Sequence, residues 1–160
     1  MNIREAVTGI NNQFPDDIKI SDQTTINLPA RIRMATLYAI SQSLNGRVVN
    51  TCNISESYVG FDTRYGDSAG DLSPLANLTK TEVIALAKEL GLPDELVHKT
   101  PQDGLTGLTD EQSFGFSYAE LDAYIRDGVE PSEEVKAKID SMHEKNLFKL
   151  QLMPSFVYQA

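Results

Sequence analysis

Only one stretch of this chain reads as a convincing β-strand, and it lies among helical segments. Arg47–Asn53 ("RVVNTCN") is a short apolar run that follows a predicted helix end at Asn45-Gly46. A weaker strand is predicted near Asp17–Ser21. One or two strands do not make a stable sheet. The sequence therefore predicts either a mostly helical domain or an α/β sheet completed by strands outside these 160 residues.

Apolar residues at helical spacing fill most of the remaining chain. Thr79 with Glu82, and Ser117 with Glu120, have the spacing of capping boxes, and Asn2 and Ser55 are candidate N-caps. Helices are expected over residues 2–14, 27–46, 55–61, 78–93, 117–128 and 131–151. No internal repeat or low-complexity linker divides the chain, so residues 1–160 are expected to form a single domain.

Charge and composition exclude several classes of protein. A formal net charge of -9 argues against non-specific binding to nucleic acid or to an anionic membrane. No apolar run approaches about 20 residues, and the N-terminus lacks the pattern of a signal peptide. The single cysteine, Cys52, requires no oxidising compartment, so the cytoplasm is the expected location.

The end of the Arg47–Asn53 strand carries the first candidate site. Ligands of α/β sheets bind outside the carboxyl ends of strands; this chain leaves the strand at Asn50-Thr51 and presents Asn53, Ser55 and Glu56. A hydroxyl followed five residues later by a carboxylate suits a nucleotide bound together with Mg²⁺. The alternative is that Glu56 merely stabilises the first turn of a helix.

The loop Gly60–Leu75 is a second candidate site, because it combines Gly, Asp, Arg and aromatic residues without apolar periodicity. Such a loop can hold a charged ligand, with Phe61 or Tyr65 facing an aromatic ring; the alternative is a solvated surface loop. Lys80 follows at a helix start, where a cation opposes the helix dipole unless an anion is bound there.

A third group lies on the helix predicted over residues 27–46. Asn27, Arg31 and Tyr38 share one face of that helix. Arg31 and the nearby Arg33 either pair with carboxylates of the fold or reach an anionic ligand or a partner chain.

Four blocks together resemble ammonia-dependent NAD⁺ synthetase, in that family's order and spacing, from about Ile3 to Phe156. They are "NLPARIRMATLYAIS", "VVNTCNISESYVGFDTRYGDSAGDLSPLANLTKTEV", "HKTPQDGLTGLTDEQSFGFSYAELDAYI" and "HEKNLFKLQLMPSF". The resemblance implies a Rossmann-like α/β fold of the adenine-nucleotide alpha-hydrolase type, here truncated and helix-rich. It also implies a homodimer that uses ATP and Mg²⁺ to amidate deamido-NAD⁺ with ammonia through an adenylate, giving NAD⁺, AMP and pyrophosphate.

The resemblance assigns a role to each candidate residue. Thr51 and Lys80 would contact ATP, and Glu56 would bind magnesium. Phe61 would stack on the pyridine ring. The remaining deamido-NAD⁺ contacts would be Asn27, Arg31, Tyr38, Arg64, Asp67 and Lys149.

Several departures from the family pattern limit these assignments. Arg64 stands at the position of a loop lysine, Gln102 where a hydroxyl residue is frequent, and Phe148 where histidine is frequent. The Ser-Gly-Gly-x-Asp-Ser loop that binds pyrophosphate in the family does not occur in these 160 residues. The chain is therefore expected to be the C-terminal portion of the enzyme and to be inactive alone. The alternatives are a non-catalytic dimeric nucleotide-binding module of the same descent and an amidotransferase of the same fold, such as a GMP synthetase.

Overall fold

The structure, a computed structural model, describes residues 1–102 and 107–157, and within these ranges the regular elements are helices. None of the helices in the described ranges is long and apolar enough to cross a membrane. The elements, in chain order, are α1 (Arg4–Asn11), α2 (Asp22–Ser43), α3 (Ile54–Val59), α4 (Lys80–Glu89), α5 (Asp94–Val97), α6 (Asp110–Phe114), α7 (Tyr118–Asp127) and α8 (Glu133–Leu150).

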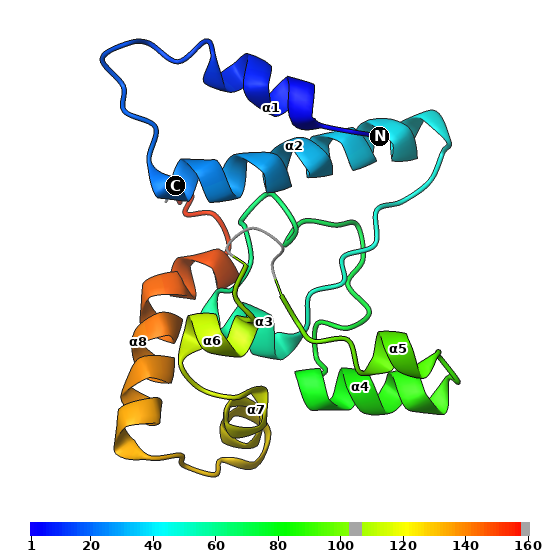
Figure 1. Ribbon diagram of the computed structural model, residues 1–160, viewed down its shortest axis with the longest axis vertical. Coiled ribbons are helices and arrows are strands. Elements are labelled where there is room, and N and C mark those ends of the chain that lie inside the picture. Colours follow the sequence, from blue (N-terminus) through cyan, green and yellow to red (C-terminus); the bar gives the residue numbers. More distant parts are fainter. Residues whose placement is uncertain (103–106, 158–160) are drawn as a thin grey trace.

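The hydrophobic core lies where α3, α7 and α8 meet, in the lower half of Figure 1. Val59, Leu121 and Ile139, one from each helix, are fully buried. The rings of Phe114, Phe116 and Tyr118 complete this cluster. An apolar side chain gains about 1.5–3 kcal/mol on full burial, so this cluster holds the three helices together.

The predicted strand at Arg47–Asn53 does not form a regular strand. Val49 makes an isolated parallel bridge to Leu72, with one hydrogen bond of 2.8 Å on each side, Asn50 N to Leu72 O and Asp71 N to Val48 O. Burial still alternates as in a strand, because Val48 is 7% exposed and Val49 50%. The backbone is extended, but a ladder needs a longer neighbour than the described residues supply. The second strand prediction, at Asp17–Ser21, is also wrong, because that segment is irregular.

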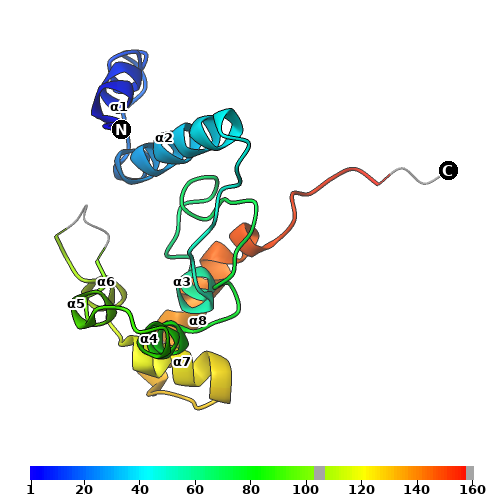
Figure 2. The ribbon, with the colours of Figure 1, turned by 90° about the vertical axis from the view of Figure 1, so that its right-hand side faces the viewer.

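Helix α2 begins at Asp22, before the predicted start at Asn27. Ser21 caps it, with its Oγ accepting a hydrogen bond from the Thr24 amide at 3.2 Å. Pro29 lies inside the helix, where its missing N–H removes one backbone hydrogen bond. Together α1 and α2 form one end of the molecule, above the loop that follows α3 (Figures 1 and 2). Only Met34 of α2 is buried, so this pair of helices shares little apolar packing with the core.

Side-chain caps fix the starts of α3, α4, α6, α7 and α8. The capping boxes predicted at Thr79 and Ser117 are both present. For α3 the predicted cap is wrong: Asn53 is the N-cap and forms a capping box with Glu56. Ser55 lies one residue inside α3 and is fully buried, so its hydroxyl is available for a contact with another helix.

Candidate functional site

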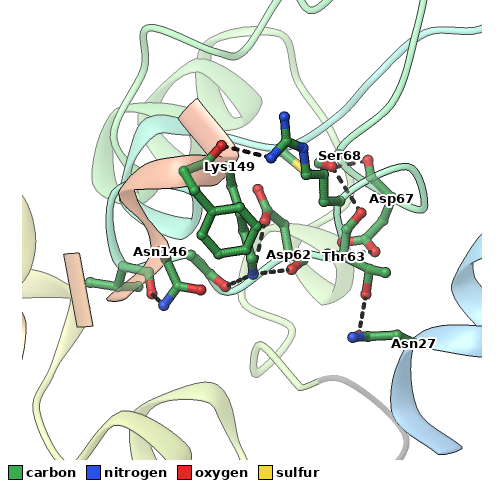
Figure 3. Close-up of polar contacts among 12 residues, drawn as sticks. Asn27, Asp62, Thr63, Asp67, Ser68, Asn146 and Lys149 are labelled. Carbon is green, nitrogen blue, oxygen red and sulfur yellow. Dashed lines mark hydrogen bonds and ion pairs between the residues drawn. The ribbon is translucent and has the colours of Figure 1, made fainter. Parts of the chain in front are cut away.

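The loop between α3 and α4 contains a tight turn at residues 63–68. The Asp67 carboxylate accepts a hydrogen bond from the Thr63 amide at 3.1 Å, and the Ser68 hydroxyl donates to the Thr63 carbonyl at 2.8 Å (Figure 3). Tyr65, at the turn, has a φ of +65°, which a non-glycine residue adopts at a cost. Asn50 donates to the Asp67 carbonyl at 2.7 Å and so ties the turn to the extended segment. The predicted ligand contact Asp67 therefore closes the turn itself.

The last turns of α8 hold the start of this loop. Lys149 Nζ donates to the carbonyls of Gly60 and Asp62, both at 2.7 Å, and lies 3.5 Å from Asp62 Oδ1 (Figure 3). Asn146 donates to the Val59 carbonyl at 3.2 Å. The Asp62 side chain is only 4% exposed, and burial raises its pKa despite the attraction of Lys149. The Lys149 ammonium group therefore binds carbonyl groups of the loop and the Asp62 carboxylate.

A cavity of about 490 Å³ lies between α2, the turn and the end of α8. We call it the arginine cavity; it is lined by Gln23, Asn27, Arg31, Arg64, Tyr65, Asn146, Phe148 and Lys149. Arg31 Nε donates to the Arg64 carbonyl at 3.1 Å, and Arg64 Nη1 donates to the Phe148 carbonyl at 2.8 Å. The Arg64 guanidinium also lies 5.2 Å from the centre of the Tyr65 ring and 5.4 Å from that of Phe148. Two guanidinium groups and two aromatic rings therefore line one cavity beside Lys149, a combination that suits an anion bearing an aromatic ring.

A second cavity, of about 420 Å³, is lined by the start of α4, by α5 and by residues 99–102. We call it the lysine cavity, because Lys80 forms an ion pair with Glu56 at its edge, Nζ to Oε1 3.0 Å. Both side chains are about one-fifth exposed. Lys80 Nζ also lies 5.2 Å from the centre of the Tyr118 ring. Burial and the nearby Glu56 raise the pKa of Tyr118, which donates its hydroxyl proton to Asp110 at 2.9 Å.

The structure explains why a lysine can begin helix α4. The first amides of α4 are all taken by side chains: Lys80 N donates to Ser55 Oγ at 2.9 Å, Thr81 N to Asp122 Oδ2 at 2.7 Å, and Glu82 N to Thr79 Oγ1 at 3.2 Å. The anion expected near Lys80 is present as Glu56. A ligand at this helix start would therefore meet the Lys80 side chain rather than free backbone amides.

The predicted site residues divide into groups. Asn27, Arg31, Arg64 and Lys149 meet at the arginine cavity, and Glu56 and Lys80 at the lysine cavity. Phe61 instead packs edge-on against Phe114, with ring centres 4.6 Å apart. Tyr38 and Thr51 line neither cavity. Tyr38 lies seven residues beyond Arg31 on α2, about 10 Å along the helix axis.

Three residues of the site were missed by the sequence analysis. Asp62 and Asn146 hold the loop, and Asp122 joins α3 to α4. The spacing of Asn146 and Lys149, which places both on one face of α8, was an available signal. Asp122 had no such signal, because its partners Ser55 and Thr81 lie far away in sequence.

The donor set for a metal is small. Within residues 1–102 and 107–157, no group of three or more His, Cys, Asp or Glu side chains is arranged to hold a metal ion. Glu56 lines the lysine cavity together with Asp110, which already accepts the Tyr118 hydroxyl, so Glu56 fits Mg²⁺ only when phosphate oxygens supply other ligands. Cys52 offers no reactive thiolate, because burial and the nearby carboxylates raise its pKa to about 12.

Comparisons with known proteins agree on one family. A model of the NAD synthase family matches residues 1–154. An NH₃-dependent NAD⁺ synthetase of Alkaliphilus oremlandii is 42% identical over 81% of this chain and 52% of its own length. The corresponding protein of Ectopseudomonas mendocina is 37% identical over 95% of this chain and 58% of its own length. The chain thus spans about half the length of the curated relatives it matches.

Solved structures with this fold include NMN synthetase from Francisella tularensis, with a TM-score of 0.85 and 34% identity, over 96% of this chain and 63% of that one. NH₃-dependent NAD synthetase from Campylobacter jejuni matches with a TM-score of 0.73 and 28% identity, over 99% of this chain and 64% of that one. These matches confirm the predicted fold class, of which the described residues form a helix-rich part.

Proposed function

Because the chain belongs to the NAD synthase family, we propose that it takes part in the ATP-dependent amidation of deamido-NAD⁺ with ammonia. In this carbon–nitrogen ligation, the pyridine carboxylate attacks the α-phosphorus of ATP and pyrophosphate leaves. Ammonia then attacks the acyl carbon of the adenylate, AMP leaves, and the amide of NAD⁺ forms. Residues 1–160, taken as one domain, would supply part of the site for both nucleotides.

The observation that carries this proposal is that residues 56–80 contribute a cation to each of two cavities, Arg64 to the arginine cavity and Lys80 to the lysine cavity. The reaction must bring two polyanions together, and positive side chains held in place reduce the repulsion between them. One loop segment that reaches both cavities can align the two substrates.

The arginine cavity is assigned to deamido-NAD⁺. Arg31 and Arg64 would bind its phosphates, and Asn27 would supply a polar contact beside them. The exposed rings of Tyr65 and Phe148 offer surfaces for an aromatic group. Phe61 would support the loop from the core side through its edge contact with Phe114.

The other assigned residues have a positional role in this proposal. Asp67 and Lys149 would keep the loop in place, since their polar groups are bound to the protein itself. Tyr38 would contribute to the site of a second copy, because it lies farther along α2 than this cavity reaches.

The lysine cavity is assigned to the phosphates of ATP. Lys80 would bind them, and Thr51, which is exposed just before α3, would contact the nucleotide. Glu56 would hold Mg²⁺ together with the phosphates. The ion would neutralise charge on the phosphates.

We also propose that the protein is a cytoplasmic homodimer. The exposed apolar residues of α2 and its C-cap support this state, because Leu37, Ile40 and the C-cap Leu44 are 44%, 41% and 76% exposed. A second copy of α2 would cover them. We propose no nucleic-acid partner, because the net charge of -9 opposes binding to a polyanion.

A second candidate substrate is a pyridine mononucleotide. The Francisella tularensis structure that matches with a TM-score of 0.85 is an NMN synthetase, whereas the Campylobacter jejuni NAD synthetase matches with 0.73. The chemistry on the pyridine carboxylate would be unchanged. Only the adenylate half of deamido-NAD⁺ would be absent.

Calorimetric titration of the chain with deamido-NAD⁺ and with nicotinate mononucleotide tests the proposal. Saturable binding is expected, and Arg31→Ala should weaken it at least tenfold, the usual effect of losing a charged hydrogen bond to phosphate. Arg33→Ala is the matched control, because Arg33 is exposed on the same helix but does not line the cavity. The nucleotide that binds more tightly identifies the substrate class, and equal effects of the two variants would contradict the assigned site.

Residues 1–160 contain no Ser-Gly-Gly-x-Asp-Ser sequence, so we propose that they bind nucleotide without releasing pyrophosphate from ATP. Release of pyrophosphate from ATP by the purified 160-residue chain would refute this point. It would not affect the binding test.

A further inference from the structure

Asp122 belongs to α7, but its carboxylate lies at the junction of α3 and α4. It is 6% exposed. Its Oδ1 accepts a hydrogen bond of 2.5 Å from the Ser55 hydroxyl, and its Oδ2 accepts one of 2.7 Å from the Thr81 amide. Ser55 Oγ, fully buried, accepts in turn from the Lys80 amide at 2.9 Å. One carboxylate and one hydroxyl therefore join the start of α3 to the start of α4.

Two charged residues of the lysine cavity, Glu56 and Lys80, are the sequence neighbours of these anchored residues. Glu56 follows Ser55, Lys80 precedes Thr81, and the Glu56 and Lys80 side chains are 3.0 Å apart. We propose that Asp122 is a positioning residue that sets the spacing and direction of the Glu56–Lys80 pair. It would act without touching the nucleotide. The inference rests on the proposed function, in which this pair receives Mg²⁺ and the phosphates of ATP.

A general clamp on α4 does not account for Asp122. Arg126, one turn further along α7, already holds the same end of α4, with its Nη2 2.6 Å from Glu82 Oε2 and 2.7 Å from the Asn77 carbonyl. The Arg126 side chain is 43% exposed, and its hydrogen bonds go to Glu82 and Asn77, which lie outside α3. Of Asp122 and Arg126, only Asp122 forms hydrogen bonds to both α3 and α4. A buried carboxylate is costly unless hydrogen bonds satisfy it, and here both of its oxygens are bonded across the junction.

The test compares Asp122→Asn with the matched control Arg126→Gln in the full 160-residue chain. Thermal unfolding first establishes that each variant is folded at the working temperature. NMR then follows the Nζ resonance of Lys80 and the carboxyl resonance of Glu56 without ligand, together with amide exchange at Lys80 and Thr81. Calorimetry measures the Kd for ATP in the presence of Mg²⁺.

We expect Asp122→Asn to shift both side-chain resonances and to speed exchange of both amides. We also expect it to weaken ATP binding about 10- to 100-fold, as loss of a residue that orients a ligand-binding group does. Arg126→Gln should leave the resonances and the Kd unchanged. Ser55→Ala removes the hydroxyl that bonds to Asp122 and to the Lys80 amide, and it should produce the same shifts. It replaces Asp122→Asn in the test if that variant does not fold.

Unchanged resonances in folded Asp122→Asn, or equal changes in the Arg126→Gln control, would overturn the inference. The proposed function fails differently. If the resonances shift as expected but the wild-type chain does not bind ATP with Mg²⁺, or Lys80→Ala binds it as tightly as wild type, the assignment of the cavity to ATP is refuted. The positioning of the pair by Asp122 would then still be supported.

Discussion

Replacement of Gly60 by alanine probes how tightly the loop is held to α8. Gly60 ends α3 in the left-handed region, with a φ of +68°. A Cβ at this position would overlap the Asn146 side chain. That side chain donates to the carbonyls of Val59 and Met142 and lines the arginine cavity. The substitution therefore strains the backbone and displaces a residue of the candidate site.

The cost can be estimated from these contacts. An alanine in the left-handed region costs about 1–2 kcal/mol. Displacing Asn146 breaks its hydrogen bonds to Val59 O and Met142 O, at about 1 kcal/mol each. We expect Gly60→Ala to lower the free energy of unfolding by about 3–4 kcal/mol.

Gly128→Ala is the matched control for the backbone term. Gly128 ends α7 with a φ of +67°, and a Cβ there would meet nothing within 4 Å. It should cost only the strain of about 1–2 kcal/mol. Urea unfolding of both variants, with unchanged m values, measures the difference of about 2 kcal/mol. If Gly60→Ala were no more destabilising than Gly128→Ala, the contact between the loop and Asn146 would not hold in solution.

Further predictions concern the buried groups around the loop and the core. Ile139→Ala, at a fully buried position, should lower the free energy of unfolding by about 2–5 kcal/mol in urea titration; a loss below 1 kcal/mol would contradict the packing of α8. Cys52 should react slowly with iodoacetamide at pH 8, because its pKa is raised to about 12, and reaction as fast as free cysteine would refute its burial. The folded-state pKa of Asp62 is raised above its ordinary 3.8, so its contribution to stability is complete below that pH and is lost as pH rises through the folded pKa. The difference in unfolding free energy between Asp62→Asn and wild type should therefore move in favour of the variant from pH 3.8 upward and then level off; no pH dependence would show that Lys149 offsets the burial.

Local chemistry made much of the helical part predictable. The capping boxes at Thr79 and Ser117 use partners three residues away, so the sequence contains all the information needed. The start of α2 was misplaced because Pro29 favours the first turn of a helix, while the residues from Asp22 onward continue the helix on its N-terminal side. A cap at Ser21 outweighs that preference.

Long-range contacts decided what could not be predicted. The extended segment at residues 47–53 has the composition of a strand, but strand formation depends on a partner, and the described residues offer only the bridge to Leu72. Phe61 was assigned to ligand, yet its ring packs on Phe114, whereas Lys149 lines the arginine cavity and also binds loop carbonyls. Residue type showed that these side chains could bind a nucleotide, and the fold determined which of them still face a cavity.

Helices α1 and α2 are weakly attached to the core and can therefore unfold locally while the core stays folded. No residue of α1 is buried, and of α2 only Met34 is, so this pair can open by local unfolding at a free energy well below that of the whole chain. The proposed second copy would bind only the folded pair. By mass action, hydrogen exchange in α1 and α2 should then slow as protein concentration rises.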